Sequence, residues 1–225
     1  QERLNTEKIA VLGISAGSVI GLTMTHTKPE LFSAFVGTGQ FVNWAEQDLL
    51  SYELLLENAK QEGNDEAISD LTELGPPPYS DSAGDDAKSK YHSAMTAAEM
   101  AAFPAFSGLM TEALTNPPAS ANYLASGIKL EHPRTLAMAA YNAIRSDLLA
   151  FDANSMSLEF PMPIFFLQGE EDVYSITSSV QAFEERITAP VKKTVLIEGG
   201  GHSVFWLREP FLAALTEHVL PSLEG

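Results

Sequence analysis

Thirty acidic against thirteen basic side chains give this 225-residue chain a formal net charge of −17. That charge repels nucleic-acid phosphates and anionic lipid surfaces, which argues against DNA, RNA and acidic membranes as partners. The chain has no cysteine, which excludes thiol catalysis, disulfide bonds and cysteine-bound metals. Because 45% of its residues are apolar and no run of about 18 apolar residues could span a bilayer, we expect a globular, cytoplasmic protein.

The first elements that the sequence predicts are a strand, a helix and a second strand. Residues 9–13 (IAVLG) form a short apolar run, and residues 15–26 follow with side chains able to form a helix. Residues 32–39 (FSAFVGTG) form another apolar run, ending in glycines, and both runs have the composition of buried strands. Two strands joined by a helix at this spacing predict a βαβ unit.

Between residues 43 and 157 the strand patterns give way to helical ones. Apolar residues recur at helical spacing over 44–60, and again over 65–74 after Asn64, a favourable N-cap residue. The segment 75–79 (GPPPY) must interrupt the helices, because three successive prolines cannot continue one. Further helices are predicted at 85–103, 107–114, 120–127 and 134–151.

Strand patterns return after residue 161. Strands are predicted at 163–169 (PIFFLQG) and 193–198 (KTVLIE), followed by helices at 176–187 and 210–219. This order predicts an α/β fold, a mostly parallel sheet flanked by helices with an inserted all-helical cap. We expect the core to comprise residues 1–42 and 158–225, and the cap to comprise residues 43–157.

The strongest chemical motif is G-x-S-x-G at residues 13–17 (GISAG), between the first predicted strand and its helix. A serine on so sharp a turn has a strained backbone that presents its hydroxyl above the sheet edge, and we expect close packing to require glycine on either side. The turn also places the Ala16 N–H at a helix N-terminus, where it can stabilise an oxyanion. Ser15 is therefore the candidate nucleophile.

A serine hydroxyl needs a base within hydrogen-bonding reach. Of the five histidines, His26 and His218 lie at the end of a predicted helix and within one, and His92 and His132 lie in the predicted cap. Only His202 follows a strand directly, and sites in α/β sheets collect at the carboxyl ends of strands. His202 is thus the candidate base.

The base needs a carboxylate that fixes its tautomer. The turn 169–172 (GEED) directly follows the strand at 163–169, again at a carboxyl end. Of its acids we favour Asp172, with Glu171 as the alternative. No histidine and carboxylate cluster has ligand-like spacing within one element, so we expect no metal.

These segments together resemble a known family. The stretches GISAGS, TKPELFSAFVGTGQFVN, GPPPY, GEED and GGGHS are similar to the prolyl-iminopeptidase-like branch of the α/β-hydrolases, over nearly the whole chain. The chain order serine, acid, histidine is also that of the fold. The resemblance implies hydrolysis without a cofactor, through an acyl-enzyme. It assigns Ser15 as nucleophile, Asp172 as acid, His202 as base and Ala16 as one oxyanion donor.

The expected substrate is a small amide, peptide or ester, with aminopeptidase activity ahead of a carboxylesterase or lipase alternative. The chain departs from the prolyl iminopeptidases beside the nucleophile, where Ile14 and Ala16 replace the usual glycine and tryptophan. In this fold several strands and a glycine-rich loop also precede the nucleophile strand. We therefore expect a longer protein, or a partner chain that supplies those strands. A catalytically silent binding module is the third interpretation.

Overall fold

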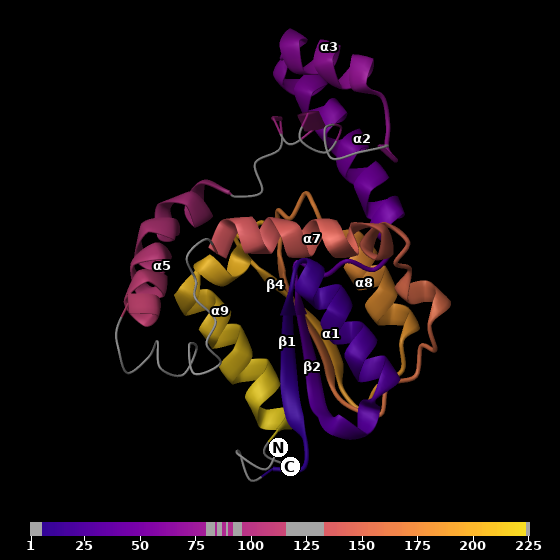
Figure 1. The fold of residues 1–225 in the computed structure, drawn as a ribbon, viewed down its shortest axis with the longest axis vertical. Coiled ribbons are helices and arrows are strands. Elements are labelled where there is room, and N and C mark those ends of the chain that lie inside the picture. Colours follow the sequence, from indigo (N-terminus) through magenta and orange to yellow (C-terminus); the bar gives the residue numbers. More distant parts are fainter. Residues whose placement is uncertain are drawn as a thin grey trace.

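The computed structural model describes residues 6–79, 84, 87–88, 90–91, 96–115 and 133–223. Within these residues, four parallel strands form one sheet in the order β1-β2-β3-β4 (Figure 1). The strands are β1 (Ile9–Ile14), β2 (Phe32–Thr38), β3 (Ile164–Gly169) and β4 (Lys192–Ile197). Each strand that the sequence predicts is therefore confirmed, with ends that differ by at most one residue.

The register of the sheet aligns the carboxyl ends of its strands. Ile14 of β1 pairs with Thr38 of β2, and Gly169 of β3 pairs with Ile197 of β4. Since all four strands are parallel, the loops that follow them emerge at one edge of the sheet. The three candidate catalytic residues lie just after β1, β3 and β4, so the topology alone brings them to the same edge.

Helices cover both faces of the sheet. α1 (Ala16–Thr27) and α8 (Thr177–Arg186) pack on one face, and α9 (Arg208–Ala214) packs on the other (Figure 1). α9 continues as a π-helical turn at Leu215–Val219, so the helix predicted at 210–219 is present with an earlier start.

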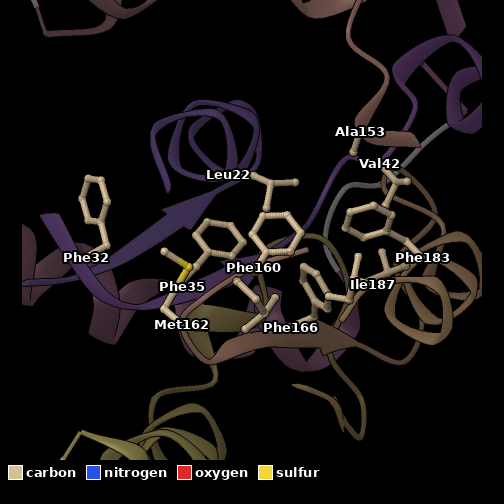
Figure 2. Close-up of a cluster of buried hydrophobic side chains, with 12 residues drawn as sticks. Leu22, Phe32, Phe35, Val42, Ala153, Phe160, Met162, Phe166, Phe183 and Ile187 are labelled. Carbon is tan, nitrogen blue, oxygen red and sulfur yellow. The ribbon is translucent and has the colours of Figure 1, made fainter. Parts of the chain in front are cut away.

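Adjacent residues of the central strands face opposite layers. Phe35 and Phe166 join the cluster with Leu22 and Phe183 (Figure 2), whereas Val36 and Phe165 join the cluster with Phe211. Such strands are buried on both faces, which is the reason that β2 and β3 have continuous apolar sequences.

β1 departs from the expected burial. It pairs with β2 on one side only, and Ile9 and Leu12 are 38% and 41% exposed. On α1, Ile20 and Met24 are also exposed. The prediction of a buried first strand is therefore wrong for the described chain, because β1 has no neighbouring strand on its second side in the part that the structure describes.

The helices between β2 and β3 agree with the sequence in part. α2 (Trp44–Glu62) and α3 (Asp65–Leu74) lie as predicted, and the Asn64 side chain caps α3 by accepting a hydrogen bond of 3.1 Å from the Ala67 N–H. α3 ends at Leu74, directly before the Gly-Pro segment. α7 (Pro133–Leu149) matches the prediction at 134–151.

Two of the predicted helices in this segment have other bounds in the structure. α5 spans Ala97–Thr115 as one helix that contains Pro104, in place of separate helices at 85–103 and 107–114. Its start is fixed by Thr96, whose hydroxyl accepts the Glu99 N–H, and the flanking alanines favour helix on both sides of the proline. The helix predicted at 120–127 lies outside the described residues.

The two ends of this helical segment lie side by side. Asn43 and Asp152 form an antiparallel bridge, the Trp44 N–H donates to the Phe151 carbonyl at 3.1 Å, and the Ala153 N–H donates to the Val42 carbonyl at 2.7 Å. The end of α7 packs with the start of α1 through Leu148 and Val19, so α7 lies across the carboxyl edge of the sheet (Figure 1). No helix in the described ranges is both long and apolar enough to cross a membrane.

Candidate active site

Ser15 occupies the sharp turn between β1 and α1. Its backbone has φ 53° and ψ −126°, and it is the only non-glycine residue with a positive φ in the part of the chain that the structure describes. The turn is held by the Ser15 N–H, which donates to the Thr38 carbonyl at 3.0 Å, and by Ser18, whose N–H and hydroxyl both donate to the Ser15 carbonyl. A strained conformation fixed from several sides is typical of functional sites.

The two glycines of the motif have different roles. A Cβ at Gly13 would lie 2.4 Å from the Gly17 carbonyl oxygen and 2.7 Å from the Ser18 Cα, so only glycine allows β1 and α1 to approach this closely. A Cβ at Gly17 would meet no atom of the described residues within 4 Å. The expectation that packing requires glycine on both sides of Ser15 is therefore wrong for Gly17, which faces open space.

The structure places His202 against Ser15. The His202 Nε2 lies 2.8 Å from the Ser15 Oγ, although the two residues are 187 positions apart in the sequence. The imidazole packs beside the rings of Tyr174 and Phe41, and its side chain is 12% exposed. Gly39 (φ +53°) also lies next to the ring, since a Cβ there would be 2.9 Å from the His202 Cε1.

Asp172 is buried behind the imidazole. Its two carboxylate oxygens lie 3.2 and 3.1 Å from the His202 Nδ1, and its side chain is fully buried. Because a carboxylate only accepts hydrogen bonds, the proton belongs on Nδ1, which leaves Nε2 free to accept from the Ser15 hydroxyl. This is the tautomer that a general base needs. Glu171 is exposed, so the geometry favours Asp172 over this alternative.

Donors surround the Asp172 carboxylate. Oδ1 accepts the N–H groups of Tyr174 and Ser175 at 2.8 and 3.0 Å, and Oδ2 accepts the Ser175 hydroxyl at 2.5 Å and the Gln168 Nε2 at 2.8 Å. Burial by itself raises the pKa of Asp172, but the His202 imidazole, the Ser175 hydroxyl and the Tyr174 N–H outweigh it and hold the pKa below its ordinary value. Asp172 is therefore ionised near neutral pH.

Three residues that support Asp172 and His202 were not predicted from the sequence. Gln168 is fully buried and joins two loops: the loop after β3 that carries Asp172, called the acid loop below, and the loop after β2. Its Nε2 donates to Asp172, and its Oε1 accepts the Gln40 N–H at 3.2 Å. Ser175 stands three residues after Asp172, a spacing at which an aspartate side chain can accept backbone N–H groups of its own turn. This spacing is visible in the sequence. Glu99, from α5, accepts the Gly201 N–H at 2.7 Å. Gln168 carried no signal in the sequence.

Glu99 is a buried carboxylate close to the candidate acid and base. Burial raises the pKa of Glu99 above its ordinary value, and the nearby Asp172 carboxylate adds to this effect. The N–H groups of Gly201 and Thr96 and the His202 imidazole act in the opposite direction and lower it. Burial wins, because the side chain has no access to solvent.

The remaining histidines lie elsewhere or outside the described residues. His26 is in the last turn of α1 and packs against Phe160, and the His218 Nδ1 lies 3.2 Å from the Lys193 Nζ. His92 and His132 lie outside the described residues. Among the described residues, no group of three or more His, Cys, Asp or Glu side chains could hold a metal ion.

Ala16 is the first residue of α1. The first N–H groups of a helix have no acceptor within the helix, and the helix dipole makes this end attractive to negative charge. Because Ala16 directly follows Ser15, its N–H can donate to an oxyanion that forms beside the Ser15 hydroxyl.

Known proteins match this chain in structure but not in sequence. No family model matches it, and no curated protein matches it. The proline iminopeptidase-related protein TTHA1809 from Thermus thermophilus superposes with a TM-score of 0.58 at 17% identity, over 99% of this chain and 67% of that one. An alpha/beta hydrolase fold protein from Chitinophaga pinensis gives 0.54 at 16%, over 97% and 67%. Est816, an N-acyl homoserine lactone degrading enzyme, gives 0.51 at 15%, over 97% and 70%.

These similarities define the fold. The α/β-hydrolase fold accounts for three features of this chain. These are a parallel sheet with helices on both faces, a sharp serine turn after one strand, and loops with the acid and the histidine after two later strands. The chain has the α/β-hydrolase fold, with an insertion of helices between β2 and β3.

Proposed function

We propose that the protein is a serine hydrolase in which Ser15 is the nucleophile, His202 the general base and Asp172 the acid that orients it. The observation that carries this proposal is the continuous contact from the Ser15 Oγ to the His202 Nε2 at 2.8 Å and from its Nδ1 to the Asp172 carboxylate at 3.1 Å. Three side chains from three separate loops meet in the order that proton transfer requires.

The proposed reaction proceeds through an acyl-enzyme. The Ser15 Oγ attacks the carbonyl carbon of the substrate while its proton passes to the His202 Nε2, and the Ala16 N–H stabilises the resulting oxyanion. His202 then gives this proton to the leaving amine or alkoxide, whose bond to the carbonyl carbon breaks. A water molecule, deprotonated by the same Nε2, then attacks the carbonyl carbon of the Ser15 ester. The bond between this carbon and the Ser15 Oγ breaks, the proton on Nε2 returns to Oγ, and the acid product leaves. Asp172 remains ionised throughout and stabilises the imidazolium.

As substrate we propose a small amide, peptide or ester, with aminopeptidase activity of the prolyl iminopeptidase type ahead of carboxylesterase or lipase activity. The sequence resemblance supports the peptidase, and a net charge of −17 suits a substrate with a free amine. Rates of hydrolysis of proline 4-nitroanilide and of short-chain 4-nitrophenyl esters separate the two activities. A larger kcat/KM for the esters would favour the carboxylesterase.

A fluorophosphonate probe tests the nucleophile directly. We expect one covalent adduct, located on Ser15 by peptide mass spectrometry, and no adduct in Ser15→Ala. The matched control is Ser178→Ala, which removes an exposed hydroxyl from α8 and should leave labelling unchanged. An adduct on another serine, or full turnover by Ser15→Ala, would contradict the proposal.

A second candidate is a catalytically silent module that binds a ligand or a partner chain. The exposed apolar side chains Ile9 and Leu12 on β1 favour it, because β1 lies at the edge of the described sheet and a strand from another chain could pair with it. If a folded sample shows no fluorophosphonate labelling, and labelling appears after a second chain is added, the protein requires a partner. Absence of labelling under every condition would support the silent module.

A further inference from the structure

The first turn of α5 lies on the loop that carries His202. Glu99 is fully buried, and its two carboxylate oxygens accept different N–H groups: Oε1 accepts the Gly201 N–H at 2.7 Å and Oε2 accepts the Thr96 N–H at 3.1 Å. The Thr96 hydroxyl accepts the Glu99 N–H at 3.2 Å and donates to the Gly199 carbonyl at 2.6 Å. Thr96 and Glu99 thus bind both sides of Gly200.

These contacts go beyond capping. In an ordinary capping box, the glutamate reaches back to the N-cap N–H and the threonine accepts the N–H of the glutamate. Both bonds are present here, but the second carboxylate oxygen and the hydroxyl proton are used on residues 102 and 103 positions away. A buried acceptor that binds the N–H directly before His202 can fix the position of the imidazole, because leaving a buried N–H without its acceptor is costly.

The opposite side of the same loop rests on the end of β3. The Glu171 N–H donates to the Gly200 carbonyl at 2.8 Å, and a Cβ at Gly169 would lie 2.2 Å from the Gly201 carbonyl oxygen. The His202 loop is therefore held between the acid loop and α5. Beyond His202, the rings of Phe103 on α5 and Trp206 lie 4.6 Å apart, so α5 contacts the chain both before and after the base.

We propose that Glu99, together with Thr96, is a positioning residue: it holds the His202 loop in the place that keeps Nε2 on the Ser15 hydroxyl, and so makes the base depend on the seating of α5. The catalytic consequence rests on the proposed function. Glu99 itself is too buried to touch a substrate.

The test compares Glu99→Ala and Glu99→Gln with one control. Glutamine keeps one acceptor oxygen for Gly201 but presents an NH₂ group to the Thr96 N–H, so it should act as a partial rescue. The control, Glu53→Gln, removes one exposed carboxylate from α2. The readouts are the maximal rate and the half-saturating concentration of fluorophosphonate labelling, hydrogen exchange of the amides of residues 199–203, and the NMR signal of the His202 Nδ1 proton.

We expect Glu99→Ala to lower the maximal labelling rate by about 10- to 100-fold with little change in the half-saturating concentration, since a misplacement of about 1 Å can cost this much. Exchange at residues 201 and 202 should rise at least about tenfold, and the Nδ1 proton signal should weaken. Glu99→Gln should lie between alanine and wild type, and the control should match wild type.

Two results would overturn the proposal: a wild-type labelling rate in Glu99→Ala or Glu99→Gln, or unchanged exchange and Nδ1 proton signal in these variants. If Glu99→Ala does not fold, Glu99→Gln alone decides. A wild-type protein that shows no labelling at Ser15 would refute the proposed function. The exchange and the Nδ1 signal would then still decide whether Glu99 positions His202.

Discussion

The same change, glycine to alanine, should have opposite effects at the two ends of the G-x-S-x-G motif. At Gly13 the new methyl group would lie 2.4 Å from a backbone oxygen of α1, and contacts of a Cβ below 3.0 Å are essentially never seen. The start of α1 and the end of β1 must therefore separate by at least about 0.6 Å. Overpacking of this kind costs about 1–3 kcal/mol.

At Gly17 the methyl group enters open space at the second position of a helix. Alanine is a better helix former than glycine by up to about 1 kcal/mol, so Gly17→Ala should leave the free energy of unfolding unchanged or raise it. For a chain of this size, 1 kcal/mol corresponds to about 2–4 °C in Tm. We expect Gly13→Ala to lower Tm by about 2–12 °C and Gly17→Ala to raise it by no more than about 4 °C.

Thermal unfolding followed by circular dichroism measures both shifts, and fluorophosphonate labelling measures the effect on Ser15. Because Gly13→Ala displaces the turn, it should slow labelling by up to about 10²-fold, whereas Gly17→Ala should label at a rate close to that of wild type. Equal destabilisation by the two substitutions, or greater destabilisation by Gly17→Ala, would refute the packing argument for this turn.

Three further predictions concern the acid and its surroundings. Asp172→Asn should slow turnover by about 10³- to 10⁴-fold, as loss of the orienting carboxylate does in serine hydrolases. Glu171→Gln should change turnover by less than about twofold. A loss in Glu171→Gln as large as that in Asp172→Asn would instead indicate Glu171 as the acid. Gln168→Ala should lower the free energy of unfolding by about 2–4 kcal/mol, because Asp172 loses a buried donor. The control Gln61→Ala, which loses an exposed amide, should change this free energy by less than about 0.5 kcal/mol. Urea denaturation measures both, and equal values would contradict the role of Gln168. The pKa of Asp172 is lower in the folded than in the unfolded protein, so its contribution to stability is complete above about pH 4 and lost as the pH falls below this value. Urea midpoints between pH 3 and pH 6 should accordingly fall more steeply for wild type than for Asp172→Asn, and parallel curves would be evidence against the shift.

Local patterns in the sequence determined the elements and their order. The apolar runs at β1 to β4, Asn64 before α3, and the prolines after Leu74 act over a few residues, and each is confirmed in the structure. Ser15 could be selected because its motif, strand and helix are all consecutive. His202 and the acid turn could be selected because parallel strands end at one edge of a sheet, a rule that needs no coordinates. Their catalytic roles stay predictions.

The tertiary structure decided what depends on atoms that are far apart in the chain. Asp172 and Glu171 are neighbours with the same charge in the sequence, and only the fold shows that the first is buried against His202 and the second is exposed. Gly13 and Gly17 look equivalent in the motif, but only Gly13 lies in a tight contact. The contact of Glu99 with Gly201, 102 residues away, is set by how α5 packs on the sheet, and no local pattern encodes it, because hydrogen bonds of this kind exist only once distant segments have been brought together.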